Sequence, residues 1–215
     1  MVINKELLSS NAASLGVDLS EDMLDKFDLL ASLLIEQNKT MNLTAITQPN
    51  EVVVKHFADS LSLLSAVEVP QGAKVLDLGT GAGFPGLPLL IARPDIRLTM
   101  VDSTAKKLAY VASTLDKLSL SAETLHARAE EAGKDPAYRE QYDIVCSRAV
   151  AALNVLCEYC LPFVKVGGTF VAMKSAKAQE ELQLAEKAIS TLGGKTVGQK
   201  SFTLSDGGER TLIII

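Results

Sequence analysis

Short apolar runs alternate with helical patterns along most of the chain, and this alternation predicts an α/β fold. Five runs of strand length are bounded by turn residues, and they span residues 74–78, 96–102, 122–126, 142–147 and 169–173. Helical spacing of apolar residues follows most of them, at 87–92, 106–118, 153–161 and 176–192. Strands that alternate with helices form a mostly parallel sheet, whose ligand crevice lies at the carboxyl ends of the strands.

The two ends of the chain depart from this alternation. Near the beginning, Ser20 is a suitable N-cap for an amphipathic helix, and residues 50–64 form a second helical pattern. Near the end, strand-like runs at 195–204 and 209–215 flank a Ser-Asp-Gly-Gly turn, which predicts an antiparallel hairpin. We therefore expect a Rossmann-like, mostly parallel seven-stranded sheet that closes with a C-terminal antiparallel hairpin.

Pro70-Gln-Gly72 marks a boundary between the helical beginning and the first strand. We divide the chain there into an N-terminal helical extension, residues 1–72, packed on a main domain of residues 73–215. The 215 residues are enough for one sizeable core.

The first strand runs into Asp77-Leu-Gly79-Thr-Gly81-Ala-Gly83-Phe-Pro-Gly86, which indicates a nucleotide-type ligand. Two templates fit this stretch. Gly81 to Gly86 matches the G-x-G-x-x-G of dinucleotide-binding proteins, whereas the alternating glycines after Asp77 resemble the S-adenosylmethionine (SAM) loop of Rossmann-like methyltransferases. We favour SAM because an acid at the strand end suits its ammonium group better than a pyrophosphate. In either case, N–H groups of the first helical turn are expected to point at the ligand.

Further site candidates follow the later strands. Asp102 ends the second strand, where an acid accepts hydrogen bonds from ribose hydroxyls, and it also suits an N-cap of the next helix. Ala129 and Glu130 follow the third strand and fall near an adenine, although Glu130 also suits the solvated start of a helix. Arg148 and Lys174 follow the fourth and fifth strands, so they reach the same edge of the crevice.

Composition narrows the class of protein. The chain is 47% hydrophobic and 22% charged, and no apolar run approaches the roughly 18 residues of a membrane span. The N-terminus lacks a signal-peptide core, and three cysteines without an export signal indicate reduced thiols, so we expect a cytoplasmic protein. Cys157-x-x-Cys160 has no second cysteine pair and shares helical spacing with leucines, which predicts core thiols and no metal site. Nothing suggests an obligate partner, so we expect a monomer.

The net charge of −5 argues at first against a nucleic-acid partner, but the acidity is unevenly distributed. Residues 1–72 carry four lysines and ten acidic residues, which leaves 17 basic and 16 acidic residues in the remainder. The main domain can therefore present a local basic face to RNA. The candidate phosphate contacts are Lys55, His56, Lys106, Lys174 and Arg210.

Several motifs together resemble one family, the small-subunit ribosomal RNA guanosine-N7 methyltransferases called RsmG or GidB. The matching segments are Asn42-Leu-Thr, Lys55-His-Phe-Ala-Asp-Ser-Leu61, Asp77 to Leu89, Asp102-Ser103, Ser147-Arg-Ala-Val-Ala-Ala-Leu153, Met173-Lys174 and Gly208-Glu-Arg210. Two positions depart from the family pattern: Lys107 stands where arginine is common, and Ser175 where glycine often follows the lysine.

The resemblance implies a class I SAM-dependent methyltransferase fold and a cytoplasmic bacterial enzyme that modifies one guanosine of 16S rRNA. It also implies SAM contacts at matching positions of this chain, namely Gly79, Phe84, Ala129, Glu130 and Arg148. Gly81 and Asp102 join them from the loop and strand pattern described above.

The residues agree with transfer to guanine N7, which has an available lone pair and no proton to lose. Such a transfer needs positioning and desolvation and no general base. Methylation of an exocyclic amine usually needs polar acceptors after the fourth strand, where this chain has Ser147-Arg-Ala. Methylation of pyrimidine C5 needs a cysteine nucleophile, and Cys146 lies inside a strand. No catalytic residue is assigned with certainty, and Arg148 is the candidate for positioning SAM or the guanine.

Three alternatives stay open at this point. A SAM enzyme of small molecules would accept substrates that lack RNA, and an NAD-dependent dehydrogenase would bind NADH. A non-catalytic ribosome-binding module would bind 30S particles without transferring a methyl group. The sequence also leaves open whether naked rRNA, an assembly intermediate or the 30S subunit is the substrate.

Overall fold

The computed structural model describes residues 2–148, 151–175 and 178–215. Residues 149–150, inside the motif that begins at Ser147, lie outside these ranges. Residues 176–177, where the last long helix is predicted to begin, also lie outside them.

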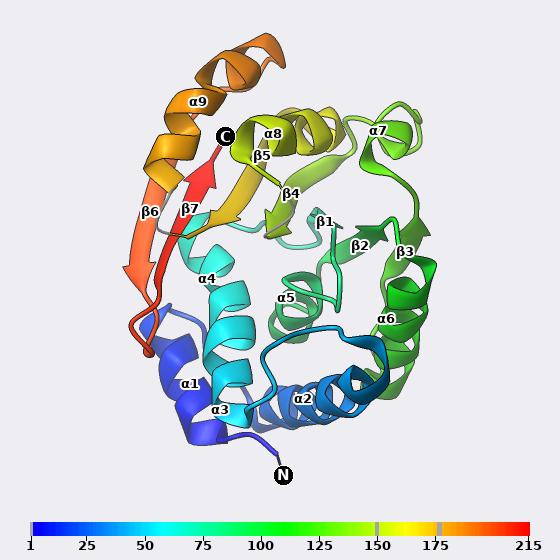
Figure 1. The fold of residues 1–215 in the computed structure, drawn as a ribbon, viewed down its shortest axis with the longest axis vertical. Coiled ribbons are helices and arrows are strands. Elements are labelled where there is room, and N and C mark those ends of the chain that lie inside the picture. Colours follow the sequence, from blue (N-terminus) through cyan, green and yellow to red (C-terminus); the bar gives the residue numbers. More distant parts are fainter. Residues whose placement is uncertain (1, 149–150, 176–177) are drawn as a thin grey trace.

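A seven-stranded sheet runs through the molecule in the order β3-β2-β1-β4-β5-β7-β6 (Figure 1). Strands β1 to β5 pair in parallel, whereas β7 pairs antiparallel with both β5 and β6. The strands are β1 (Lys74–Leu78), β2 (Arg97–Asp102), β3 (Glu123–His126), β4 (Tyr142–Arg148), β5 (Val164–Lys174), β6 (Gly198–Thr203) and β7 (Glu209–Ile214). The predicted fold class, with its C-terminal hairpin, is confirmed.

Helices cover both faces of this sheet and divide the apolar side chains into two cores. The described helices are α1 (Lys5–Ser14), α2 (Glu21–Met41), α3 (Pro49–Val52), α4 (Asp59–Ala66), α5 (Gly86–Ala92), α6 (Ala105–Leu118), α7 (Ala129–Ala132), α8 (Leu153–Cys160) and α9 (Ala178–Thr191). One core lies under α1 to α6 and the other under α7 to α9. Strand side chains alternate between them: Val75 enters the first core and Leu76 the second.

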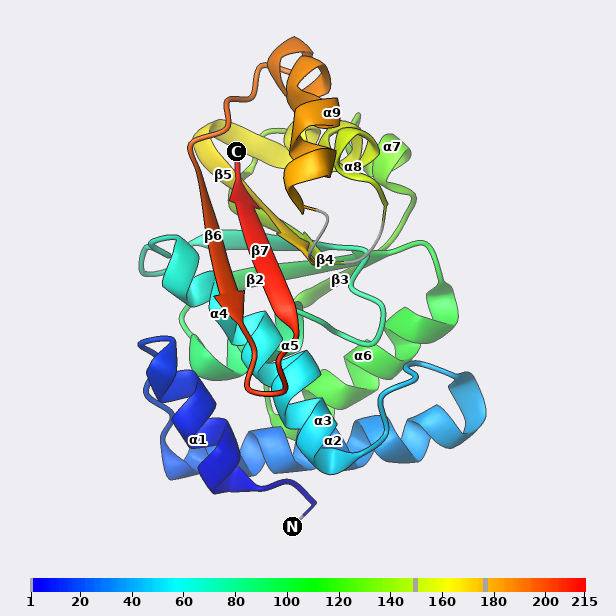
Figure 2. The same ribbon diagram turned by 60° about the vertical axis from the view of Figure 1, so that its left-hand side comes forward.

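The N-terminal helices extend the first core outward. Helix α1 packs mainly against Val53–Ala58, and α2 packs mainly against α5 and α6 (Figures 1 and 2). Leu8 and Phe27, both fully buried, belong to the same core as Val75 of β1. We infer that residues 1–72 fold together with the main domain, and the boundary at residue 72 stays a prediction.

Three local features differ from the sequence-based expectation. Helix α1 was not predicted, because only Leu8 and Ala12 of its ten residues are buried and its apolar pattern is weak. The helix predicted at 50–64 is a compound one, in which a π-helical segment, Val53–Ala58, joins α3 to α4. Strand β5 begins at Val164 and not at residue 169, where its run was predicted to begin, and its pairing with β4 is irregular between these two positions.

The hairpin of β6 and β7 is held against the compound helix (Figure 2). Lys200 Nζ donates to the carbonyl oxygen of Ser65 at 2.6 Å. Near the turn, Lys55 Nζ lies 3.6 Å from a carboxylate oxygen of Asp206. This packing brings Arg210, on β7, beside residues at the carboxyl ends of β4 and β5.

Candidate cofactor and acceptor site

The glycine loop begins where β1 ends and is fastened to the neighbouring strand. The backbone N–H groups of Gly79 and Thr80 both donate to the carbonyl oxygen of Val101, at 2.8 and 3.0 Å. Gly79 and Gly81 have φ angles of 73° and 59°, in the left-handed region that side chains disfavour. The loop therefore keeps a fixed, open course that brings its backbone close to a ligand.

The helix after the loop is not a free anion site, which corrects one expectation. Asp77, with no exposed surface, accepts hydrogen bonds through Oδ2 from Thr80 Oγ1 at 2.6 Å and from Gly86 N at 2.9 Å. Leu87 N donates to Gly83 O, so these first-turn N–H groups are used inside the protein. Burial raises the pKa of Asp77 to about 6. Asp77 therefore braces the loop and does not line the cavity, and the place of a pyrophosphate is already taken by a carboxylate.

Asp102 links the glycine loop to the next helix. Its Oδ2 accepts from Gly81 N at 2.9 Å, and its Oδ1 accepts from Thr104 N at 2.8 Å. The N-cap of α6 is Thr104, so the alternative interpretation of Asp102 as that N-cap is wrong. Asp102 is 8% exposed and borders the cavity described next, where its remaining lone pairs can accept hydroxyl donors.

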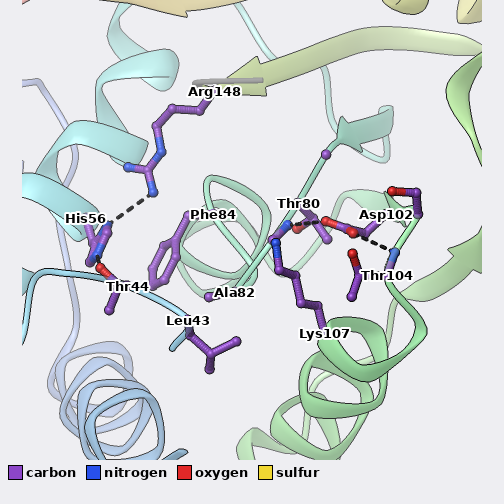
Figure 3. A pocket seen from close by; sticks show the side chains of 13 residues that line it. Leu43, Thr44, His56, Thr80, Ala82, Phe84, Asp102, Thr104, Lys107 and Arg148 are labelled. Carbon is purple, nitrogen blue, oxygen red and sulfur yellow. Dashed lines mark hydrogen bonds between the residues drawn. The ribbon is translucent and has the colours of Figure 1, made fainter. Parts of the chain in front are cut away.

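A cavity of about 410 Å³ lies over this loop (Figure 3). Five predicted SAM contacts are in its wall: Gly79, Gly81, Phe84, Asp102 and Arg148. The others do not reach it. Ala129 is half-buried and Glu130 exposed, both on α7 beyond the end of β3, and their contact with the cofactor stays a prediction.

Several residues of the wall were not among the predicted site residues, and three of them lie outside the glycine loop and the turn after β2. Leu43 and Thr44 come from the connection between α2 and α3, and Lys107 comes from the first turns of α6 (Figure 3). Only the family motif Asn42-Leu-Thr and the Lys107 departure gave any signal for them. Its neighbour Lys106, which was predicted as a phosphate contact, is exposed and lines a separate groove between α2 and α6.

Arg148, His56 and Phe84 form one packed cluster at the end of the cavity (Figure 3). The rings of His56 and Phe84 stack with centroids 4.6 Å apart, and the Arg148 guanidinium carbon lies 5.3 Å from the Phe84 ring centre. Arginine can only donate, so Arg148 Nη2 donates to His56 Nδ1 at 3.2 Å. The ring proton therefore resides on Nε2, which lies 2.9 Å from Thr44 Oγ1.

His56 is a neutral residue of this cluster. It is 8% exposed, and burial together with the charge of Arg148 lowers its pKa to about 3. A neutral ring with both nitrogens hydrogen-bonded is poorly suited to hold a phosphate. His56 therefore serves as a wall residue of the cavity, and we no longer count it among the phosphate contacts.

A second cavity of about 690 Å³ adjoins the first and shares His56 and Arg148 with it. Four cationic side chains line it: Lys55, Arg148, Lys174 and Arg210. The carboxylates of Asp59 and Glu181 also belong to its wall. Cations outnumber carboxylates here although the chain as a whole carries a net charge of −5.

The cations of this second cavity are partly neutralised. Lys174 is 8% exposed, and its Nζ donates to Glu181 at 2.7 Å and to the carbonyl oxygen of Ala151 at 2.5 Å. Lys55 is paired with Glu51, whose carboxylate raises the pKa of the lysine. Arg148 and Arg210 therefore have the most N–H groups left for a substrate.

None of the three cysteines lines either cavity. Cys146, Cys157 and Cys160 are free and buried, and burial raises the pKa of each thiol. Among the described residues, no group of three histidine, cysteine or acidic side chains is arranged to hold a metal ion. In the same parts of the chain, no helix combines the length and apolar character of a membrane span.

Comparison with known proteins identifies the family. The family model described as "GidB: rRNA small subunit methyltransferase G" matches residues 23–213. The ribosomal RNA small subunit methyltransferase G of Pelotomaculum thermopropionicum is 45% identical over all of this chain and 90% of its own length. That of Lachnoclostridium phytofermentans is 48% identical over 94% of this chain and 84% of its own length.

Solved structures agree on the fold. A SAM-dependent methyltransferase from Aquifex aeolicus superposes with a TM-score of 0.58 at 19% identity, over 81% of this chain and 97% of that one. A SAM-dependent O-methyltransferase from Thermotoga maritima gives the same TM-score at 16% identity, over 84% and 70% of the two chains. With the glycine loop, the paired cavities and the match over nearly its whole length, this chain belongs to the rRNA small subunit methyltransferase G family.

Proposed function

We propose that this protein transfers a methyl group from SAM to N7 of a guanosine in 16S rRNA. Membership of the family makes it a SAM-dependent methyltransferase of ribosomal RNA. The observation that carries the finer proposal is the pair of adjoining cavities that share Arg148 and His56. One is built on the glycine loop and suits the donor, and the other is lined with cations and suits the nucleotide.

The residues of the first cavity fit SAM. Bound there, SAM supplies a methyl group on a sulfonium. Gly81 has open space where a side chain would point, with only Gly79 O at 3.9 Å, so the backbone can lie directly against the cofactor. Asp102 is positioned to accept from ribose hydroxyls, and Lys107 adds a cation beside the loop. The carboxylate of Asp77 fills the helix N-terminus, which disfavours a pyrophosphate and hence NAD.

The second cavity supports transfer without a general base. His56 is neutral, but its Nδ1 accepts from Arg148 and its Nε2 proton is directed at Thr44, so it has no lone pair for a substrate proton. Asp59 is held by two arginines, and Lys174 is paired with Glu181. Guanine N7 requires no deprotonation, so these residues need only to hold the base in line with the sulfonium and exclude water.

The cations of the second cavity support an RNA substrate. Lys55, Arg148, Lys174 and Arg210 gather around one opening, where they can neutralise phosphate groups. Lys106, on the exposed side of α6, is a more remote proposed contact. We further propose a monomer that acts in the cytoplasm on the 30S subunit or a precursor of it.

Transfer of labelled methyl from SAM to 30S subunits that lack this modification tests the proposal. We expect the label in 7-methylguanosine after digestion of the 16S rRNA to nucleosides. Naked 16S rRNA and assembly intermediates, tested in parallel, identify the form of the substrate. Label in another nucleoside would refute N7 transfer. SAM binding without any transfer would favour a small-molecule substrate or a non-catalytic ribosome-binding role.

A further inference from the structure

Asp59 joins two arginines that come from distant parts of the chain. Its Oδ2 accepts from Arg148 Nη1 at 2.9 Å, and its Oδ1 accepts from Arg210 Nε at 3.1 Å. Asp59 is 4% exposed, whereas the side chains of Arg148 and Arg210 retain 15% and 26% of their exposure. A buried carboxylate thus sits behind two guanidinium groups that border the second cavity.

Each of the two arginines keeps N–H groups that no described residue accepts. The two N–H groups on Arg148 Nη1 go to Asp59 and to the carbonyl oxygen of Lys55, and one on Nη2 goes to His56. Arg210 uses Nε for Asp59 and one N–H of Nη1 for the carbonyl oxygen of Glu209. A guanidinium has five N–H groups, so within the described residues two remain on Arg148 and three on Arg210. These N–H groups remain available to a ligand beside either arginine.

The backbone that carries Asp59 is unusual. The π-helical segment Val53–Ala58 ends directly before it, and that segment also carries His56, which contacts the other side of Arg148. Single π-turns inside α-helices are frequent at functional sites, because the extra residue redirects the side chains that follow. The compound helix contacts Arg148 from two positions three residues apart, His56 and Asp59.

We infer that Asp59 is a positioning residue for methyl transfer, and this inference rests on the proposed function. Without its charge, two guanidinium groups beside one cavity would repel each other. With it, both are fixed and their outward N–H groups face the oxygen acceptors of the target nucleotide. Asp59 borders the second cavity and not the first, so its effect concerns the acceptor and not the binding of SAM.

The test is the Asp59→Asn variant, which keeps the shape of the side chain and removes its charge. We expect kcat for transfer to 30S subunits to fall by about ten- to a hundredfold, the range that misplacement of reacting groups produces. The Kd for SAM, measured by calorimetry, should stay within about twofold, because His56, Lys55 and Phe84 still hold Arg148 at the first cavity.

Asp95→Asn is the matched control. Asp95 pairs with Arg93 at 2.7 Å, at the opposite ends of the strands, so this variant also breaks an aspartate–arginine pair. We expect it to lower the urea midpoint of unfolding without lowering kcat. A double-mutant cycle with Arg210→Gln adds a readout that a merely structural role would not change: Asp59→Asn should cost less activity once Arg210 is gone.

Each outcome has one meaning. Three results would each overturn the role of Asp59. They are an activity of Asp59→Asn within threefold of the wild type, equal losses of SAM binding and methyl transfer, and strictly additive losses in the double-mutant cycle. Wild-type protein that binds SAM but labels no rRNA would instead overturn the proposed function, since Asp59 is not involved in that comparison.

Discussion

Gly83→Ala should destabilise the fold, because both the backbone conformation of Gly83 and the packing around it disfavour a side chain. The φ angle of Gly83 is 94°, and an added Cβ would lie 2.8 Å from Leu87 Cγ and still closer to Cδ1. Leu87 is completely buried in the first turn of α5, so it cannot move away without disturbing the core. The backbone strain and the overpacking therefore add to each other.

The magnitude follows from a comparison with Gly72→Ala. Gly72 has a φ of 69° and nothing within 4 Å of an added Cβ, so its substitution introduces backbone strain alone. That strain costs about 1–2 kcal/mol, offset by about 0.5 kcal/mol from the stiffer unfolded chain. Overpacking adds about 1–3 kcal/mol at Gly83. We expect losses of about 1 kcal/mol for Gly72→Ala and about 2–4 kcal/mol for Gly83→Ala.

Urea and thermal unfolding of the two variants beside the wild type provide the assay. For a chain of 215 residues, each kcal/mol lowers Tm by about 2–4 °C. A third variant, Gly81→Ala, separates folding from ligand binding, since its Cβ would point into open space at the cavity. Gly81→Ala should reduce the free energy of SAM binding by more than it reduces the free energy of unfolding. Equal unfolding midpoints for Gly83→Ala and Gly72→Ala would refute the packing argument.

Three further predictions concern the cavity walls and the core. Lys107→Ala should raise the Kd for SAM about two- to fivefold, because it removes a cation from the wall, while the exposed neighbour Lys106→Ala should leave it unchanged; calorimetry compares them. The stability advantage of the wild type over His56→Gln should shrink by about 1.6 kcal/mol between pH 6.5 and pH 5, measured by urea unfolding. The unfolded chain takes up a proton there that the buried ring, with its pKa lowered to about 3, does not, so stability falls as the pH falls; a constant difference would contradict this. The three buried thiols should react with a thiol reagent only on unfolding, and fast reaction of the native protein would contradict their burial.

The local patterns determined most of the fold. A run of apolar residues with a glycine turn after it has few stable arrangements, so β1, the loop and α5 were predictable from residues 74–92 alone. The spacing of apolar residues and the residue types at the turns likewise predicted the other strands and the closing hairpin. Helix α1 was not predicted because its stability comes from two residues that enter a core built by other elements. A local sequence pattern does not show such tertiary packing.

Some residues of the site were likewise predictable from the sequence, and others were not. The sequence by itself determined that the glycine loop, Asp102 and Arg148 lie at the crevice, because each stands at the carboxyl end of a parallel strand. Only the tertiary structure decided that Asp77 braces the loop, that Lys107 and not Lys106 faces the cavity, and that Asp59 joins Arg148 to Arg210. These are matters of side-chain direction and of contacts between residues up to 151 positions apart, which are fixed when the helices and the hairpin pack and not before.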